Sequence, residues 1–249
     1  MKNEEVNYFK SIINSITYGN NVFTVWYRNE KVLMGAILKD EPLIQRFFNY
    51  ATIYNTIKDV DTKIKFSLNK TIHLADDLDF ETWQPLQSPS EEEFQATYYM
   101  ENALFRIESL WDLLAQLFNL KENINKPFDK IYAEQLFHDA QQGKKAKAFA
   151  KKVYAYMQQQ DDLNVEPWEG NYDYVKNFRN KMTHRISPNI TSFSSYGMEL
   201  RMPVILTLKR VIEDYNQVSQ FIHEILDDIL KDYEFLNNVK LYVEEENNV

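Results

Sequence analysis

Apolar residues recur every three or four positions along most of the chain, which is the period of an amphipathic α-helix. Residues 22–36 are the main exception, since their β-branched residues favour two short strands around a polar turn, with a helix as the alternative. The periodic stretches predict helices over residues 3–17, 42 to about 66, 91–120, 127–143, the Lys-rich stretch after 143, 172–187 and 199–233. The sequence therefore predicts an all-α protein.

The longest predicted helix, residues 199–233, carries apolar residues alternately four and three positions apart. This spacing is typical of the seam of a helical bundle, and we expect the seam to pack within its own chain. The helix over 91–120 is apolar on most sides from Leu104 onward, as in the central helix of a bundle. Together the two helices predict an up-and-down bundle.

Residues 76–90 interrupt the periodicity with two prolines and an acidic cluster. Ser90 and Glu93 then form a capping-box signature for the next helix. We therefore expect a linker over 76–90, which divides an N-terminal, mostly helical accessory region (1–75) from a bundle (91–236). An acidic tail, residues 237–249, ends the chain.

Composition narrows the classes of function. The chain has no Cys and only 5 Gly, which argues against disulfides, thiolate metal sites and Gly-rich phosphate loops. No apolar run approaches the ~18 residues of a membrane span, and the N-terminus does not resemble a signal peptide. We expect a cytoplasmic protein without membrane contact.

Charge is unevenly distributed. The formal net charge of −9 argues against nonspecific nucleic-acid binding by the whole molecule. Two stretches are nevertheless basic: 144–152, with five Lys, and 172–187, with Lys176, Arg179, Lys181 and Arg185. A basic face on an acidic body suits a specific phosphate-bearing ligand, although a solvated surface is the ordinary alternative.

The segment 172–187, YDYVKNFRNKMTHRIS, is where the sequence suggests chemistry. As a helix it would bury Val175, Phe178 and Met182 on one side. Arg179 and His184 would then lie roughly 140° apart around the helix axis. One straight helix does not aim both groups at one small target, so either the helix ends before Ser187-Pro188 or a second chain completes the site.

The carboxylates Glu101, Glu108 and Asp112 line one face of the central helix. Buried carboxylates need partners, and Arg179 is a natural one, with contact to water or to Arg106 as the alternative. The four His are widely separated, and no HExxH, GxSxG, P-loop or GxGxxG motif is present. This leaves chemistry by a guanidinium and an imidazole, with no metal or other cofactor expected. Such a pair suffices for RNA cleavage.

A helical bundle with Arg, a polar residue and then His on a late helix resembles the HEPN superfamily, here as Arg179-Asn180-x3-His184. The resemblance covers about residues 90–236. It implies a metal-independent endoribonuclease that attacks through the RNA 2′-hydroxyl, in a bacterial toxin or phage-defence context, and that works as a homodimer through the helix of the motif. Ile186 stands where some toxin members have a Tyr, so control by modification of that Tyr is not expected.

The resemblance also assigns roles. Arg179 and His184 would be catalytic, and RNA would be the substrate. The residues expected to position the substrate are Asn180, Lys181, Lys176 and Arg185, with Glu108 and Asp112 as carboxylate partners. Some members have lost catalysis, so the alternative is a non-catalytic HEPN-like module that binds protein, nucleotide or RNA. An antitoxin or another protein is a further expected partner.

Overall fold

The computed structural model describes residues 3–19, 22–23, 26–27, 30–31, 42–76, 78, 83–143, 147–160, 169–184, 187–194 and 197–232. Within these residues the chain is almost entirely helical. The elements in order are α1 (Asn3–Ser15), β1 (Trp26–Tyr27), β2 (Glu30–Lys31), α2 (Pro42–Asp76), α3 (Glu91–Lys121), the 3-10 helix η2 (Phe128–Lys130), α4 (Ala133–Gln141), α5 (Lys147–Met157), α6 (Asn171–His184), β3 (Ser192–Ser194), β4 (Gly197–Glu199) and α7 (Val204–Asp232). The predicted all-α bundle is confirmed.

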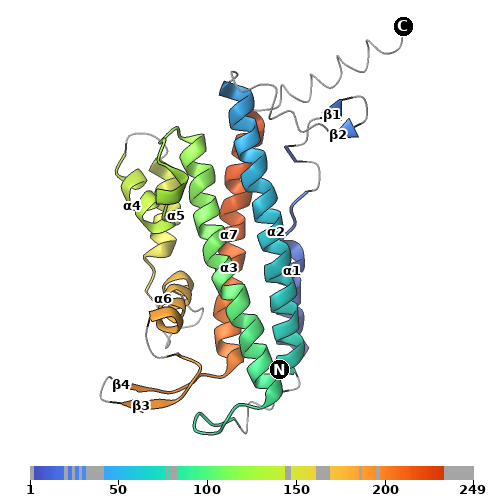
Figure 1. Ribbon diagram of the computed structural model, residues 1–249, viewed down its shortest axis with the longest axis vertical. Helices are drawn as coiled ribbons and strands as arrows, with labels where there is room; N and C mark the ends of the chain where they lie inside the picture. The colour runs from blue at the N-terminus through green and yellow to red at the C-terminus, as the bar shows by residue number, and fades with distance from the viewer. Residues whose placement is uncertain are drawn as a thin grey trace.

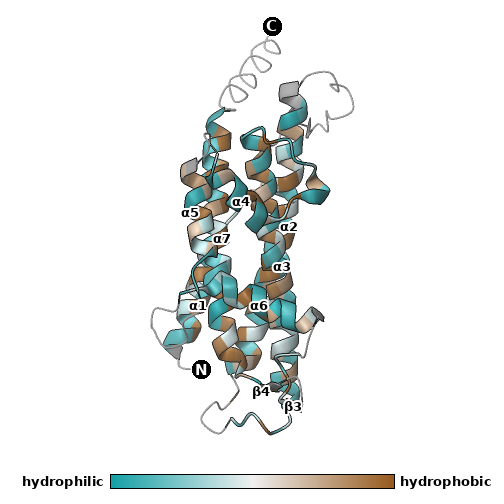
Figure 2. Cartoon of the chain, turned by 90° about the vertical axis from the view of Figure 1, so that its left-hand side faces the viewer, coloured by the Kyte–Doolittle hydropathy of each residue, from teal (hydrophilic) through white to brown (hydrophobic). Residues whose placement is uncertain are grey.

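Three long helices, α2, α3 and α7, run side by side along the molecule (Figure 1). Helix α1 packs against α2 and α7, while α4, α5 and α6 lie on the other side of α3. Hydrophobic and hydrophilic positions alternate around the helices, as the periodicity requires (Figure 2). All eight apolar seam positions of α7 are buried within this one chain: Val204, Leu208, Val211, Tyr215, Val218, Ile222, Ile225 and Ile229.

Residues 76–90 do not divide two cores. Helix α2 lies along α3, and buried side chains from α1 and α2 belong to the same hydrophobic core as those of α3 to α7. The expected accessory region, residues 1–75, therefore contributes two helices to the bundle expected over 91–236. The acidic tail expected over 237–249 lies outside the described residues.

Three predicted helix boundaries were wrong by five residues or more. The helix expected from 127 begins as α4 at Ala133, after the separate 3-10 helix η2. Helix α2 continues to Asp76, ten residues beyond the expected end near 66, because Ile72 and Ala75 still reach the core. Helix α7 begins at Val204 and not at residue 199, since the residue before Pro203 is driven towards extended backbone. Glu199, the expected first residue of that helix, instead ends β4, which pairs antiparallel with β3.

Only one of the two hydrogen bonds of the predicted capping box forms at the start of α3. The Ser90 hydroxyl accepts a hydrogen bond from the backbone N–H of Glu93 at 3.2 Å. The Glu93 carboxylate, however, pairs with Arg201 and accepts from the Trp83 indole N–H at 2.8 Å. The Glu93 carboxylate thus binds Arg201 and Trp83, whereas in a capping box it would accept a hydrogen bond from the backbone N–H of Ser90.

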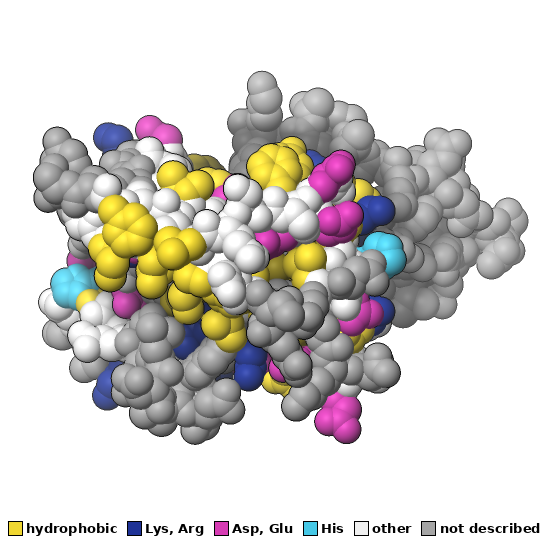
Figure 3. All heavy atoms as spheres, turned by 90° about the horizontal axis from the view of Figure 1, so that it is seen from below, with side chains coloured by type: hydrophobic (Ala, Val, Ile, Leu, Met, Phe, Trp, Pro, Cys, Tyr) yellow, Lys and Arg dark blue, Asp and Glu magenta, His cyan; other side chains and the backbone are white. Residues whose placement is uncertain are grey.

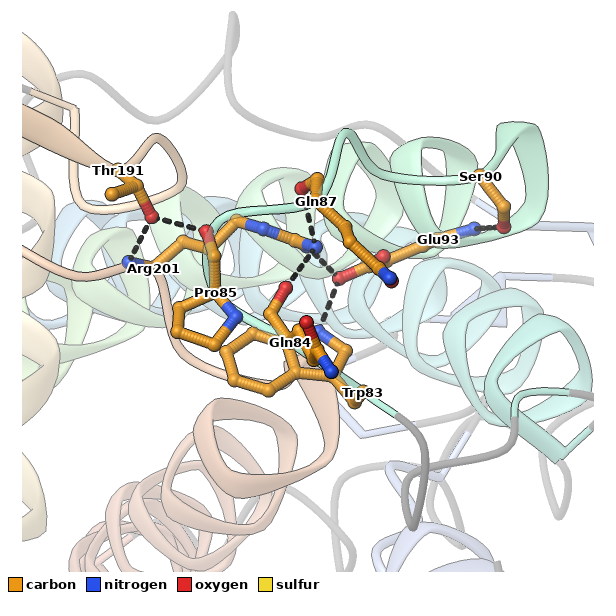
Figure 4. A network of polar contacts seen from close by, with 8 residues as sticks. All are labelled: Trp83, Gln84, Pro85, Gln87, Ser90, Glu93, Thr191 and Arg201. Atoms are coloured by element: carbon orange, nitrogen blue, oxygen red, sulfur yellow. Dashed lines mark hydrogen bonds and ion pairs between the residues drawn. The ribbon is translucent and has the colours of Figure 1, made fainter.

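Arg201 joins the α2–α3 connection to the segment that precedes α7 (Figure 4). Its guanidinium pairs with Glu93, donates to the carbonyls of Gln84 and Gln87, and lies 4.9 Å from the centre of the Trp83 ring. The Glu93 and Arg201 side chains are 10% and 6% exposed. This pair fixes the end of the bundle from which the β3–β4 hairpin extends.

No helix in the described ranges combines the length and the apolar character needed to cross a membrane.

Candidate functional site

Helix α6 lies across α3 and α7 with one apolar side buried. Tyr172, Val175 and Phe178 are buried, and Met182 packs partly against the core. The buried side is the stripe predicted from the sequence. It places Arg179 at the edge of the contact between α6 and α3.

Arg179 forms an ion pair with Glu108 of α3. The two side chains are 28% and 29% exposed, so the pair lies in a partly open position. The buried Nε–H of Arg179 has no hydrogen-bond partner among the described residues. Burial raises the pKa of Glu108 above its ordinary value, and the Arg179 charge opposes that rise.

Asp112, one turn further along α3, has a different partner. Its carboxylate accepts a hydrogen bond from the Ala133 backbone N–H, at the first turn of α4, at 3.1 Å. An acidic group at a helix N-terminus is favoured by the helix dipole. Burial raises the pKa of Asp112, while this hydrogen bond and the charge of Arg179 act in the opposite direction. Asp112 therefore fixes the start of α4 against α3.

Glu101, two turns before Glu108 on the same face of α3, accepts a hydrogen bond from the Asn189 side-chain amide. Asn189 lies five residues after the His of the Arg-x4-His motif, and Arg179 is the first residue of the motif. The carboxylate face of α3 therefore holds the chain on both sides of His184. Burial raises the pKa of Glu101, and the amide hydrogen bond lowers it.

The two lysines expected to position a substrate are also paired. Lys176 contacts Glu134 at the start of α4, and Lys181 contacts both carboxylate oxygens of Glu199 on β4, at 2.9 and 3.1 Å. These pairs attach α6 to α4 on one side and to the hairpin on the other. Basic residues thus run along α6 from the α4 side to the hairpin.

Asn180 is partly exposed, and its backbone carbonyl accepts from the Thr183 hydroxyl at 3.5 Å. Helix α6 ends at His184. The side chain of His184 lies outside the described part of the chain, as do Arg185 and Ile186. The backbone alone separates Arg179 and His184 by five helical positions, so the two Cβ directions diverge by roughly 140°.

A second polar cluster lies inside the bundle, and the sequence analysis did not identify it. Asp214 of α7 is fully buried, and its carboxylate accepts from the Trp111 indole N–H at 3.0 Å and the Tyr156 hydroxyl at 2.9 Å. Burial raises its pKa to about 7. The one signal in the sequence is a carboxylate directly before Tyr215, a residue of the apolar seam of α7.

Comparison with known proteins gives one family. The family model described as Cthe2314-like HEPN matches residues 43–234. The match extends from the first turn of α2 through α7 and so contains both α6 and the α3 carboxylates. No curated protein and no solved structure matches the chain.

Proposed function

Because the chain belongs to the Cthe2314-like HEPN family, we propose that it is a metal-independent endoribonuclease that cleaves RNA with Arg179 and His184. The observation that carries the proposal is the position of Arg179. It lies inside the family match, at the edge of α6, held by Glu108 yet still partly open to solvent. HEPN domains often bind RNA and dimerise, which fits this arrangement.

The chemistry needs a base and a charge stabiliser. In the proposed reaction His184 takes the proton of an RNA 2′-hydroxyl, and the resulting oxyanion attacks the adjacent phosphorus. The bond to the 5′-oxygen of the next nucleotide breaks, and that oxygen takes up a proton. The products are a 2′,3′-cyclic phosphate and a 5′-hydroxyl. Arg179 would stabilise the charge that gathers on the non-bridging oxygens.

The α3 carboxylates would act by holding other residues of the site in place. Glu108 limits the freedom of the Arg179 guanidinium, and Glu101 holds Asn189 beyond the motif. A guanidinium held in this way loses less conformational entropy when it meets a phosphate. Asn180, Lys176, Lys181 and Arg185 would guide the RNA backbone along α6.

The proposed active form is a homodimer through α6. Five helical positions, or roughly 140° around the helix axis, separate Arg179 from His184, so a two-fold axis close to α6 would bring Arg179 of one copy near His184 of the other. The proposed setting is a bacterial toxin or phage-defence system, with an antitoxin or another protein as partner.

The direct test is RNA cleavage in EDTA. Purified wild type, Arg179→Ala and His184→Ala are incubated with total RNA, and cleavage is followed on denaturing gels. We expect wild-type cleavage and at least about a 10²-fold loss in each variant. Arg106→Ala on α3 and His73→Ala on α2 are matched controls, and both should cleave as wild type does. If wild type leaves the RNA uncleaved, or if all the proteins cleave it equally, the proposal is overturned.

A second function is favoured by one end of the molecule. Apolar side chains gather on the surface at the hairpin end (Figure 3). The exposed residues there are Leu86, Ile190, Phe193, Met198, Leu200 and Met202. Phe193 and Met198 are paired across β3 and β4, and each is 66% exposed. Such a patch is typical of a protein-binding surface, which a non-catalytic HEPN-like module would use.

A further inference from the structure

A cleft of about 580 Å³ opens between α4 and α5, and Glu134 is the single side chain described above that lines it. This volume lies within the range of small-molecule sites. The cleft is lined by Tyr132, Glu134, Gln135, His138 and Tyr154. Three of the five are rings, and the other two carry hydrogen-bonding oxygens.

Two of the three rings, those of His138 and Tyr154, contact each other before any ligand arrives. The His138 imidazole contacts the Asp139 carboxylate at 3.1 Å, and its centre lies 5.3 Å from the centre of the Tyr154 ring at an interplanar angle of 62°. The Tyr132 carbonyl accepts the first backbone hydrogen bond of α4, from Leu136 N–H at 2.9 Å. The Tyr132 side chain is 66% exposed, so much of its ring surface is free for stacking.

The polar wall of the cleft offers acceptors. The Gln135 amide nitrogen donates to Asp139 at 2.8 Å, which leaves its carbonyl oxygen to accept. One oxygen of the Glu134 carboxylate accepts a hydrogen bond from the Lys176 ammonium group. Carboxylate and amide oxygens pair with N–H donors, and Glu in particular accepts from the amino group of cytosine. The wall is also acidic, which disfavours a phosphate inside the cleft.

Glu134 links the cleft to α6. It lines the cleft and pairs with Lys176, which stands three residues, or less than one helical turn, before Arg179. Helices α4, α5 and α6 lie on the same side of the molecule (Figure 1). A nucleotide whose base lies in the cleft would therefore direct its phosphate towards Lys176 and Arg179, where positive charge is available.

We propose that the α4–α5 cleft binds a nucleobase of single-stranded RNA, one that carries an exocyclic amino group, by stacking on Tyr132 and hydrogen bonding to Glu134 and Gln135. Stacking on aromatic side chains is the general way in which proteins hold unpaired bases. The inference rests on the proposed function, because it takes RNA to be the substrate. It adds a base-binding subsite beside the proposed catalytic pair.

The test measures RNA affinity separately from cleavage. Full-length His184→Ala protein is titrated into fluorescein-labelled oligocytidine, and fluorescence anisotropy reports the Kd. Adding Tyr132→Ala should weaken binding by about 5- to 100-fold, whereas Tyr132→Phe, which keeps the ring, should bind as the parent does. Tyr98→Ala on α3 removes another exposed tyrosine, 55% exposed, and should leave the Kd unchanged. Oligouridine should bind the parent more weakly than oligocytidine.

An oligonucleotide of the same length with abasic ribose at every position separates base from backbone. It should bind the parent and the Tyr132→Ala protein equally. Equal Kd values for the parent and Tyr132→Ala on oligocytidine would overturn the inference, as would equal affinities for oligocytidine and oligouridine or no RNA binding at all. A different result overturns the proposed function. If wild type leaves RNA uncleaved while Tyr132→Ala still weakens RNA binding, the base-binding cleft is supported and the proposed catalysis is not.

Discussion

Arg179 on α6 and Glu108 on α3 form an ion pair across the contact between the two helices, and each side chain keeps more than a quarter of its surface exposed. An ion pair this open contributes less than about 1 kcal/mol to stability. In the proposed reaction, an RNA phosphate would replace the carboxylate at small cost. The pair would then orient the guanidinium in the free protein and release it to the substrate.

Loss of the Glu108 carboxyl should affect cleavage more than stability. Glu108→Ala should lower the single-turnover cleavage rate about 10-fold, because the guanidinium loses its fixed position. Glu108→Gln keeps an oxygen that accepts from Arg179 and should retain most of the rate. The free energy of unfolding, measured in urea, should change by less than about 1 kcal/mol in both variants. A Glu108→Ala rate equal to that of wild type would exclude a positioning role.

Mixing two inactive variants tests the homodimer. If each site takes Arg179 from one copy and His184 from the other, an Arg179→Ala/His184→Ala heterodimer retains one intact site of its two. With random subunit exchange at equal concentrations, we expect about one quarter of wild-type cleavage. Each variant alone, incubated in the same way, is the control. A mixture as inactive as its components would place both groups of a site on one chain or show that no dimer forms.

Asp214 should make stability fall as pH rises. Burial raises its pKa to about 7 in the folded protein from the ordinary 3.8, so the folded state binds more protons between these values. The free energy of unfolding should therefore decrease by on the order of 4 kcal/mol from pH about 4 to about 7, as far as this group is concerned.

Asp214→Asn keeps an acceptor for Trp111 but cannot ionise, so most of that slope should disappear. The variant should also be more stable than wild type above pH 7. Asp227→Asn, an exposed site on the same helix, should leave the slope unchanged. Urea unfolding across the pH range measures both, and an unchanged slope in Asp214→Asn would contradict the assignment.

The buried pair of Glu93 and Arg201 should show strong coupling. Arg201→Met leaves the Glu93 carboxylate without its cation and should cost about 3–5 kcal/mol of unfolding free energy. The double variant Glu93→Leu, Arg201→Met removes both charges and should lose less than the sum of the single changes. A double-mutant cycle by urea unfolding gives the coupling energy. Additive losses would show that the two side chains act independently.

How far the sequence leads depends on the range of the interactions involved. The apolar period predicted the helices, and Ser90 predicted the start of α3, because both depend on residues within a turn or two. The start of α7 and the β3–β4 hairpin were missed. Their conformation depends on Pro203 together with distant contacts, among them the link from Arg201 to Glu93.

By itself, the sequence determined the helical class and the side of α6 that is buried, because both follow from the helical period of its apolar residues. It also gave directly an Arg and a His five positions apart. Only the tertiary structure decided which carboxylate meets Arg179 and that α3 also holds Asn189 beyond the motif. It alone placed Asp214 among Trp111 and Tyr156, and a cleft of aromatic rings beside Lys176. These are contacts between residues far apart in the chain, and helical periodicity fixes how each helix faces the core but not which side chains meet across it.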